Sequence, residues 1–131
     1  MNVQIRRLSR ADSDFYNLLG PYFGSRSVAR EIGINVYDDE SKRWFTAFMG
    51  NDLVGFASLR GRTVSDCYVV SSHRRGGVFR AMLSSVLLEN RVGLTATCTD
   101  ASLGSFLSLG FKIKIRTKNF TKVELTCQRK G

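Results

Sequence analysis

The feature that most constrains the fold of this chain is a strand pattern that passes through a short basic turn directly into a helix pattern. Residues 63–70 are rich in β-branched and aromatic side chains, and residues 78–88 repeat apolar side chains at helical spacing. The turn between them contains two arginines and two glycines at positions 74–77. A strand that leads into a helix in this way belongs to an α/β sheet, because the helix carries the chain across one face of the sheet.

The elements on either side of this segment extend the same sheet. We expect strands at 3–8, 44–49, 53–59, 63–70, 94–98, 111–116 and 120–126, helices at 9–19, 28–32, 78–88 and 99–109, and a loop at 36–42. A strand meander followed by a β-α-β-α-β run predicts an α/β fold with a mixed, largely antiparallel central sheet of about seven strands and helices on both faces. With 131 residues, one domain over 1–131 accounts for the chain.

Composition indicates where this domain is located and whether it binds a metal. No apolar run reaches the length of a membrane helix, and residues 1–7 lack the apolar region of a signal peptide, so we expect a cytoplasmic protein. Cys67, Cys98 and Cys127 form no C-x-x-C pair and His73 is the only histidine, which predicts no metal site and small apolar roles for the cysteines. Both a monomer and a homodimer are compatible with the sequence.

The turn and the start of the following helix predict an anion-binding site. Free N–H groups and the positive end of the helix dipole meet at this point. Gly76 and Gly77 allow close backbone approach, while Arg74, Arg75 and Arg80 add positive charge. The spaced glycines of a dinucleotide fingerprint and the Gly-Lys-Ser/Thr of a P-loop are both missing. A diphosphate suits the site, and a solvated turn is the alternative interpretation.

Three segments resemble the GNAT acetyltransferase superfamily. Arg74-Arg75-Gly76-Gly77-Val78-Phe79 is similar to the acyl-CoA pyrophosphate motif of that superfamily, Arg/Gln-x-x-Gly-x-Gly/Ala. Phe106-Leu-Ser-Leu-Gly110-Phe111 is similar to its aromatic-x-x-x-Gly-Phe pattern, and 47–57 resembles its central hairpin. The matches run from about residue 44 to 116, and the first 43 residues fit by element order alone.

The resemblance implies an N-acyltransferase that passes an acetyl or other acyl group from acyl-CoA to an amine by direct attack in a ternary complex, without a metal. It assigns the cofactor contacts to Cys67, Val69, Val70, Arg74, Arg75, Gly76, Gly77, Val78 and Arg80. Two residues depart from the superfamily pattern. Phe79 replaces a Gly or Ala beside the phosphates, so its side chain has to turn into the core. Phe106 replaces a tyrosine that is often the general acid, and phenylalanine cannot donate a proton.

Candidate catalytic residues lie on the strand before the turn and on the last helix. Asp66 is the candidate general base, and strand alternation predicts that it shares a face with Val64, Tyr68 and Val70. A solvent-facing carboxylate at the strand edge is the alternative. Tyr68, Ser102 and Ser105 are candidate general acids, and a tyrosine that packs in the core or at the rim is the alternative for Tyr68. His73 is expected to pack, and Cys67 is a candidate nucleophile without an evident basic partner.

A formal net charge of +9 and a pI near 10 favour polyanionic partners. Basic residues alternate along the penultimate strand, at Lys112, Lys114, Arg116 and Lys118, opposite Phe111, Ile113 and Ile115. From residue 112 to 130, Lys122, Arg129 and Lys130 bring the basic residues to seven, against one acidic residue, Glu124. The row predicts phosphate contacts with nucleic acid or another polyanion, or otherwise a solvated sheet face.

The basic row makes a nucleic-acid-associated acceptor one expectation. Among GNAT-like proteins the Mom group of phages modifies DNA bases, although no residue here singles out that group. A catalytically silent GNAT-like module that binds CoA or nucleic acid is the alternative function, and Phe106 favours it.

Overall fold

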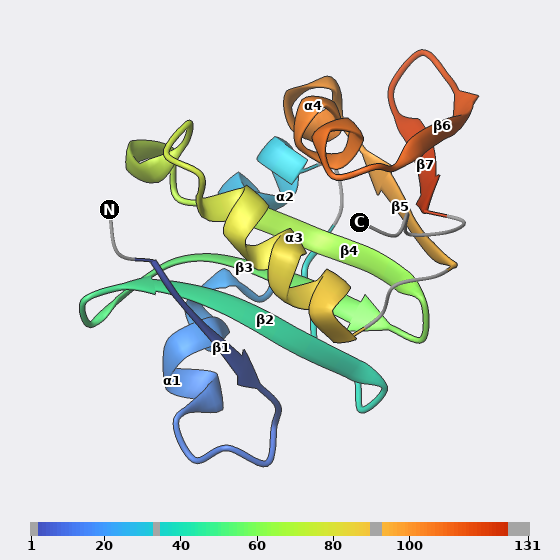
Figure 1. The fold of residues 1–131 in the computed structure, drawn as a ribbon. Coiled ribbons are helices and arrows are strands. Elements are labelled where there is room, and N and C mark those ends of the chain that lie inside the picture. The colour runs from blue at the N-terminus through green and yellow to red at the C-terminus, as the bar shows by residue number, and fades with distance from the viewer. Residues whose placement is uncertain (1–2, 33–34, 90–92, 126–131) are drawn as a thin grey trace.

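Seven strands form one sheet in the computed structural model, which describes residues 3–32, 35–89 and 93–125 (Figure 1). The strands lie in the order β1-β2-β3-β4-β5-β7-β6, and all neighbours are antiparallel except the parallel pair β4 and β5. Their bounds are β1 Gln4–Leu8, β2 Lys42–Met49, β3 Asp52–Arg60, β4 Thr63–Val69, β5 Leu94–Cys98, β6 Lys112–Arg116 and β7 Thr121–Leu125. The predicted fold class is confirmed. Cys127, Arg129 and Lys130 lie outside the described residues.

Helices cover both faces of this sheet. They are α1 Phe15–Leu19, α2 Arg26–Ile32, α3 Val78–Glu89 and α4 Asp100–Ser108, with short 3-10 helices η1 Gly20–Tyr22 and η2 Ser71–His73. On β2, the buried Trp44 packs in the cluster of α1 and α2, and its neighbour Phe45 packs in the cluster of α3 and α4. This period-2 alternation of buried aromatic residues is what a strand between two helix layers requires. Within the described ranges no helix has the length and apolar character needed to cross a membrane.

The first helix is shorter than the sequence predicts. Ser9 and Asp12 have the spacing of a helix-capping pair, and the Ser9 N–H does donate to Asp12 Oδ2 at 2.8 Å. The contact closes a separate turn, in which the Asp12 N–H donates to the Ser9 carbonyl at 2.9 Å, and α1 begins only at Phe15. A capping pattern is therefore insufficient where the next residues, Ser13 and Asp14, favour turns over helix.

A bulge in β4 overturns the predicted side-chain alternation. Ser58 pairs with Ser65 and Phe56 pairs with Tyr68, so β4 has one more residue than β3 between these pairs. Asp66 is one of the two residues of this bulge, and its φ of 51° lies in the left-handed region. As a result Val64 packs toward α3, whereas Tyr68 packs toward α1 and α2. The prediction that Asp66, Val64 and Tyr68 share one face is wrong, because a bulge reverses the alternation beyond it.

Gly55 on β3 allows the start of α3 to lie close to the sheet. A Cβ at this position would stand 2.9 Å from the Tyr68 carbonyl oxygen and 3.3 Å from Val78 Cγ1. The lack of a side chain at Gly55 thus brings the first turn of α3 against the end of β4.

Candidate functional site

The parallel strands β4 and β5 separate and open a cavity between them. They pair only at Thr63 with Thr95 and at Val64 with Ala96, and the ladder does not continue past these residues. The cavity has a volume of about 610 Å³ and is lined by the rest of β4, the end of β5, the first turns of α3 and α4, and the end of α2. This volume lies within the range of small-molecule and cofactor sites.

One end of the cavity is built from the start of α3. The first helical hydrogen bond runs from the Ala81 N–H to the Gly77 carbonyl at 2.9 Å, which leaves the N–H groups of residues 78–80 without helical partners. Gly77 has a φ of 85° and nothing within 4 Å of a would-be Cβ, so the backbone here is open. Arg75, with φ of 65°, and Arg80 lie beside it and line the cavity. Donors, dipole and cations together form a cradle for an anionic group.

Arg74 is held by contacts with β4 and α2. Its Nε donates to the Val69 carbonyl at 2.8 Å, its Nη2 donates to Glu31 Oε1 at 3.0 Å, and the guanidinium stacks on the Tyr68 ring. Arg74 thereby connects the end of β4 to α2 at the rim of the cavity. Arg80 also lines the cavity, and its Nη1 donates to Ser108 Oγ at the end of α4 at 3.2 Å.

The end of β4 presents backbone groups to the gap between the strands. The Val70 N–H donates to the Val54 carbonyl of β3 at 2.8 Å. Because successive residues of a strand direct their N–H groups to opposite sides, the Val69 N–H points toward the gap. This peptide group is available to polarise a carbonyl that lies in the cavity.

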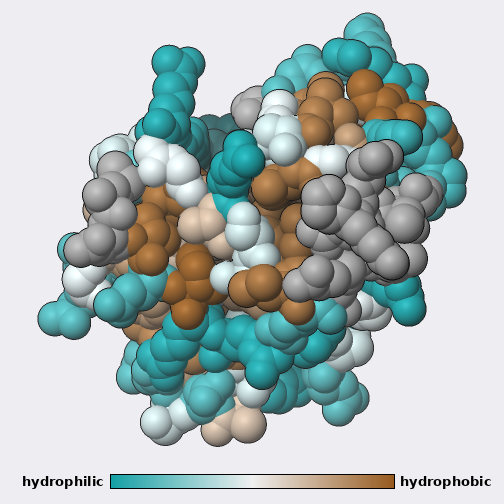
Figure 2. Space-filling view, in the orientation of Figure 1, coloured by the Kyte–Doolittle hydropathy of each residue, from teal (hydrophilic) through white to brown (hydrophobic). Residues whose placement is uncertain are grey.

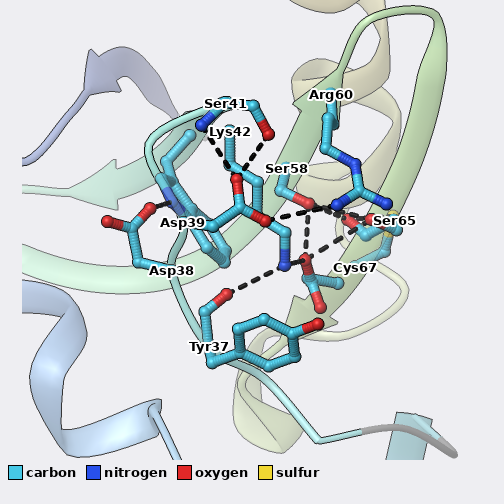
Figure 3. A network of polar contacts seen from close by, with 11 residues as sticks. Tyr37, Asp38, Asp39, Ser41, Lys42, Ser58, Arg60, Ser65 and Cys67 are labelled. Atoms are coloured by element: carbon cyan, nitrogen blue, oxygen red, sulfur yellow. Dashed lines mark hydrogen bonds and ion pairs between the residues drawn. The ribbon is translucent and has the colours of Figure 1, made fainter.

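Asp66 is neither isolated nor solvent-facing, because a buried network holds its carboxylate. Figure 3 shows its partners Lys42 and Ser58. Lys42 Nζ donates to Asp66 Oδ2 at 2.8 Å and to the Tyr37 carbonyl at 2.8 Å. Ser58 Oγ donates to the same Asp66 Oδ2 at 2.6 Å. The side chains of Lys42 and Asp66 are only 6% and 2% exposed, so the ion pair is enclosed. It ties the bulge of β4 to the start of β2 and the end of β3, and Asp66 still contributes to the cavity lining.

The chain was compared with known proteins both by sequence and by structure. The chain matches no protein-family model and no curated relative by sequence. Among solved structures it is similar to Escherichia coli ElaA, with a TM-score of 0.71, 13% identity and coverage of 94% of this chain and 99% of that one. An acetyltransferase from Thermus thermophilus gives a TM-score of 0.70, 18% identity and coverages of 95% and 96%. A GNAT family acetyltransferase from Elizabethkingia anophelis with acetyl-CoA bound gives a TM-score of 0.64, 15% identity and coverages of 95% and 98%.

The chain has the GNAT fold. The overall backbone arrangement is thus shared along almost the whole length of proteins at 13–18% identity. Identities this low establish the fold and leave the activity to be argued from the residues of the site.

The two phenylalanines that depart from the GNAT sequence pattern pack together. Phe106 is 1% exposed and stands edge-to-face with Phe79 and with Phe111, at centroid distances of 5.4 and 5.1 Å. Phe79 joins the core cluster of Leu83 and Leu87, as the helix pattern predicts. The inner wall of the cavity is therefore aromatic where a tyrosine hydroxyl is usual in the GNAT pattern.

The other predicted catalytic side chains are spread along the cavity of this GNAT fold. Ser102, in the first turn of α4, lines it and donates its hydroxyl to the Thr99 carbonyl at 3.3 Å. Tyr68 lines it from the α2 side, and its pKa is raised, first by burial and second by the charge of Glu31. His73 Nδ1 lies 3.0 Å from Ser72 Oγ, on the rim. The described residues contain no group of three potential metal ligands.

Glu31 is the residue of the site that the sequence interpretation missed. It lines the cavity from the end of α2 and contacts Arg74. A single glutamate on a short polar helix carries no local signal, and only the folded arrangement brings α2 to β4.

Cys67 lines the cavity, but its thiol is held protonated. Burial, and next the neighbouring Asp66 carboxylate, raise its pKa well above the usual value. We expect iodoacetamide to modify Cys67 at least about tenfold more slowly than N-acetylcysteine at pH 8, because the thiolate is the reactive species. The rate should continue to rise through about pH 10, where a free thiol levels off. Peptide mapping by mass spectrometry at several pH values measures this, and a plateau near pH 8 would contradict it.

The basic row of β6 lies on the free edge of the sheet. All five residues of β6 are exposed, and a bulge between Ile113 and Ile115 breaks the predicted alternation. Ile113 and Ile115 are 43% and 50% exposed, and Figure 2 shows hydrophobic residues among hydrophilic ones over α4 and β6. Acidic residues already contact part of the row, since Lys114 pairs with Glu124 at 3.5 Å and Arg116 pairs with Asp100 at 3.7 Å.

Proposed function

We propose that this protein is an N-acyltransferase that uses acetyl-CoA or another acyl-CoA and transfers the acyl group directly to an amine. The observation that carries the proposal is the continuous cavity that joins the α3 cradle to the separated ends of β4 and β5. The acetyl-CoA bound by the GNAT protein of Elizabethkingia anophelis supports this choice of cofactor. We further propose that residues 1–131 act as one domain in the cytoplasm.

In this proposal the residues of the cavity have three roles: they bind the pyrophosphate, polarise the carbonyl and donate a proton. The N–H groups of residues 78–80, with Gly76, Gly77, Arg75 and Arg80, bind the pyrophosphate, and Arg74 supports the rim. The Val69 N–H polarises the carbonyl oxygen as the amine attacks. Tyr68 and Ser102 remain the candidate proton donors in the lining. Acyl-CoA, when bound, supplies the activated thioester carbonyl.

Cofactor binding tests the proposal first. We expect acetyl-CoA to raise the thermal midpoint in a saturable way, with about 2.7 kcal/mol of stabilisation at about 100 times Kd. Adenosine alone should give a much smaller shift, because it lacks the pyrophosphate. An unchanged midpoint at millimolar acetyl-CoA would refute the cofactor assignment.

The acceptor has a candidate docking surface in the basic edge. Arg116 at the end of β6 contacts Asp100, which directly follows the cavity-lining Thr99. A polyanion on β6 would thus lie next to the mouth of the cavity. This proximity supports a nucleic-acid-associated acceptor, including a protein amine presented on nucleic acid.

Salt dependence tests that surface. Each phosphate contact contributes about −0.9 to the slope of log K against log salt on duplex DNA. Lys112→Gln together with Lys114→Gln should therefore reduce the slope by up to about 1.8 units. Arg7→Gln with Arg43→Gln is the control, because it removes the same charge from β1 and β2, at the other end of the strand order from β6. Both arginines contact Glu89, and the double variant should leave the slope unchanged. Equal slopes in all three proteins would mean that the β6 edge is only solvated.

Phe106 supports a second candidate, a silent module that binds CoA without turnover. Its buried ring occupies the position at which the GNAT pattern has a phenol. Acetyl-CoA binding with no release of free thiol across a panel of amines would favour this alternative.

A further inference from the structure

Two carboxylates line the cavity within the described residues, and they differ in what they can still bind. Asp66 is enclosed, with a side chain 2% exposed and the donors Lys42 and Ser58 on its Oδ2. Glu31 is 41% exposed, and its one ion-pair partner, Arg74, is 42% exposed. Glu31 is therefore the carboxylate that an incoming molecule can reach.

Glu31 also lies close to the backbone that would hold the reacting carbonyl. The guanidinium of Arg74 donates to Val69 O at 2.8 Å and to Glu31 Oε1 at 3.0 Å. One guanidinium thus spans the distance from Glu31 to the Val69 peptide group. A ligand nitrogen at Glu31 would stand beside a carbonyl polarised by the Val69 N–H.

The surroundings of Glu31 favour a cation with an apolar stem. Ile32 follows Glu31 and lines the same cavity, and Tyr68 supplies an aromatic face with a phenol near the carboxylate. The Arg74 guanidinium lies 5.6 Å from the centroid of that ring and holds Glu31 Oε1, so an incoming ammonium group would bind the other carboxylate oxygen, Oε2. A carboxylate beside an aromatic ring is a suitable site for an ammonium group.

We propose that Glu31 binds the acceptor as an ammonium ion, so that the acceptor is an aliphatic amine and not a neutral nucleobase amine. This inference rests on the proposed acyl transfer. An aliphatic amine has a pKa near that of lysine, about 10.4, and arrives protonated at neutral pH. A charge-assisted hydrogen bond to Glu31 positions it, and the nitrogen gives up one proton, to Glu31 or to solvent, before it attacks the thioester carbonyl. An uncharged exocyclic amine can donate a hydrogen bond to Glu31 but lacks the attraction between opposite charges.

A binding experiment that needs no turnover tests this assignment. The CoA-loaded protein is titrated with n-butylammonium chloride, n-butanol or adenosine at constant ionic strength and followed by amide NMR shifts. We expect saturable shifts at Ile32, Tyr68 and Val69 with n-butylammonium only. Glu31→Gln should raise the Kd for n-butylammonium at least about tenfold, by loss of a charge-assisted hydrogen bond. Glu89→Gln, which alters a glutamate paired with Arg7 at 2.7 Å, should not change it.

The outcomes separate this inference from the proposed function. Failure of the unmodified protein to bind CoA refutes the acyltransferase proposal itself. If CoA binds, equal n-butylammonium affinity in Glu31→Gln overturns the role of Glu31. Shifts with adenosine or n-butanol instead of n-butylammonium overturn the cationic acceptor, and this comparison uses the unmodified protein alone. Glu31→Gln should bind CoA at least as tightly as the unmodified protein, since it removes a negative charge near the cradle.

Discussion

Replacing Lys42 by alanine should lower the free energy of unfolding by about 3–5 kcal/mol, because it leaves the Asp66 carboxylate buried without its counter-ion. Both side chains of this pair are almost fully enclosed. The Tyr37 carbonyl would lose its donor as well, since Lys42 Nζ serves both acceptors. Urea unfolding measures the loss, and the acetyl-CoA shift should fall with it, because Asp66 anchors the bulge that directs the Val69 N–H into the cavity.

Two further variants show whether the effect arises from the buried charge. Lys42→Met with Asp66→Asn should recover most of the lost stability, since it removes both buried charges, keeps an acceptor for Ser58 and places a residue that tolerates the positive φ. Arg6→Ala removes the Arg6–Asp14 pair, whose side chains are 47% and 40% exposed, and should leave the urea midpoint nearly unchanged. A Lys42→Ala loss as small as that of Arg6→Ala would show that Asp66 finds other compensation.

The fold could be predicted from the sequence because its signals are local and repeated. The alternating aromatic residues of β2, the Gly50 turn and the apolar periodicity of α3 each determine one element, and the order of the elements determines the sheet. Predicted and observed strand bounds differ by two residues or fewer. The main error lies at α1, where Ser9 and Asp12 satisfy each other in a turn and no helix follows directly.

The site could be predicted only in part, because much of it depends on contacts between distant residues. The cradle at Gly76 and Gly77 is encoded within one segment and is visible in the sequence. The surroundings of Asp66 are not, since its partner Lys42 lies 24 residues away and the bulge gives a non-glycine residue a positive φ. Glu31 is equally hidden, because its contact with Arg74 spans 43 residues.

Replacing Gly77 by valine should abolish stabilisation by acetyl-CoA. A β-branched residue at φ of 85° costs about 1–2 kcal/mol in backbone strain, and its side chain would project where the free N–H groups of α3 begin. We expect the Kd for acetyl-CoA to rise at least about 100-fold, because displacing an anion from the cradle removes several charge-assisted hydrogen bonds together. At about 100 times the original Kd, stabilisation should then fall from about 2.7 to about 0.4 kcal/mol.

Gly61→Val is the matched control for backbone strain. Gly61 has a φ of 60° and nothing within 4 Å of a would-be Cβ, and it lies in the turn between β3 and β4, at the other end of β4 from the cradle. This variant should lose a similar amount of stability and keep the full acetyl-CoA shift. If Gly77→Val also kept the shift, the start of α3 would not hold the pyrophosphate, since no anion could bind those N–H groups past a valine side chain. If both variants lost it, general destabilisation would be the cause, and only a loss confined to Gly77→Val assigns the cradle to the cofactor.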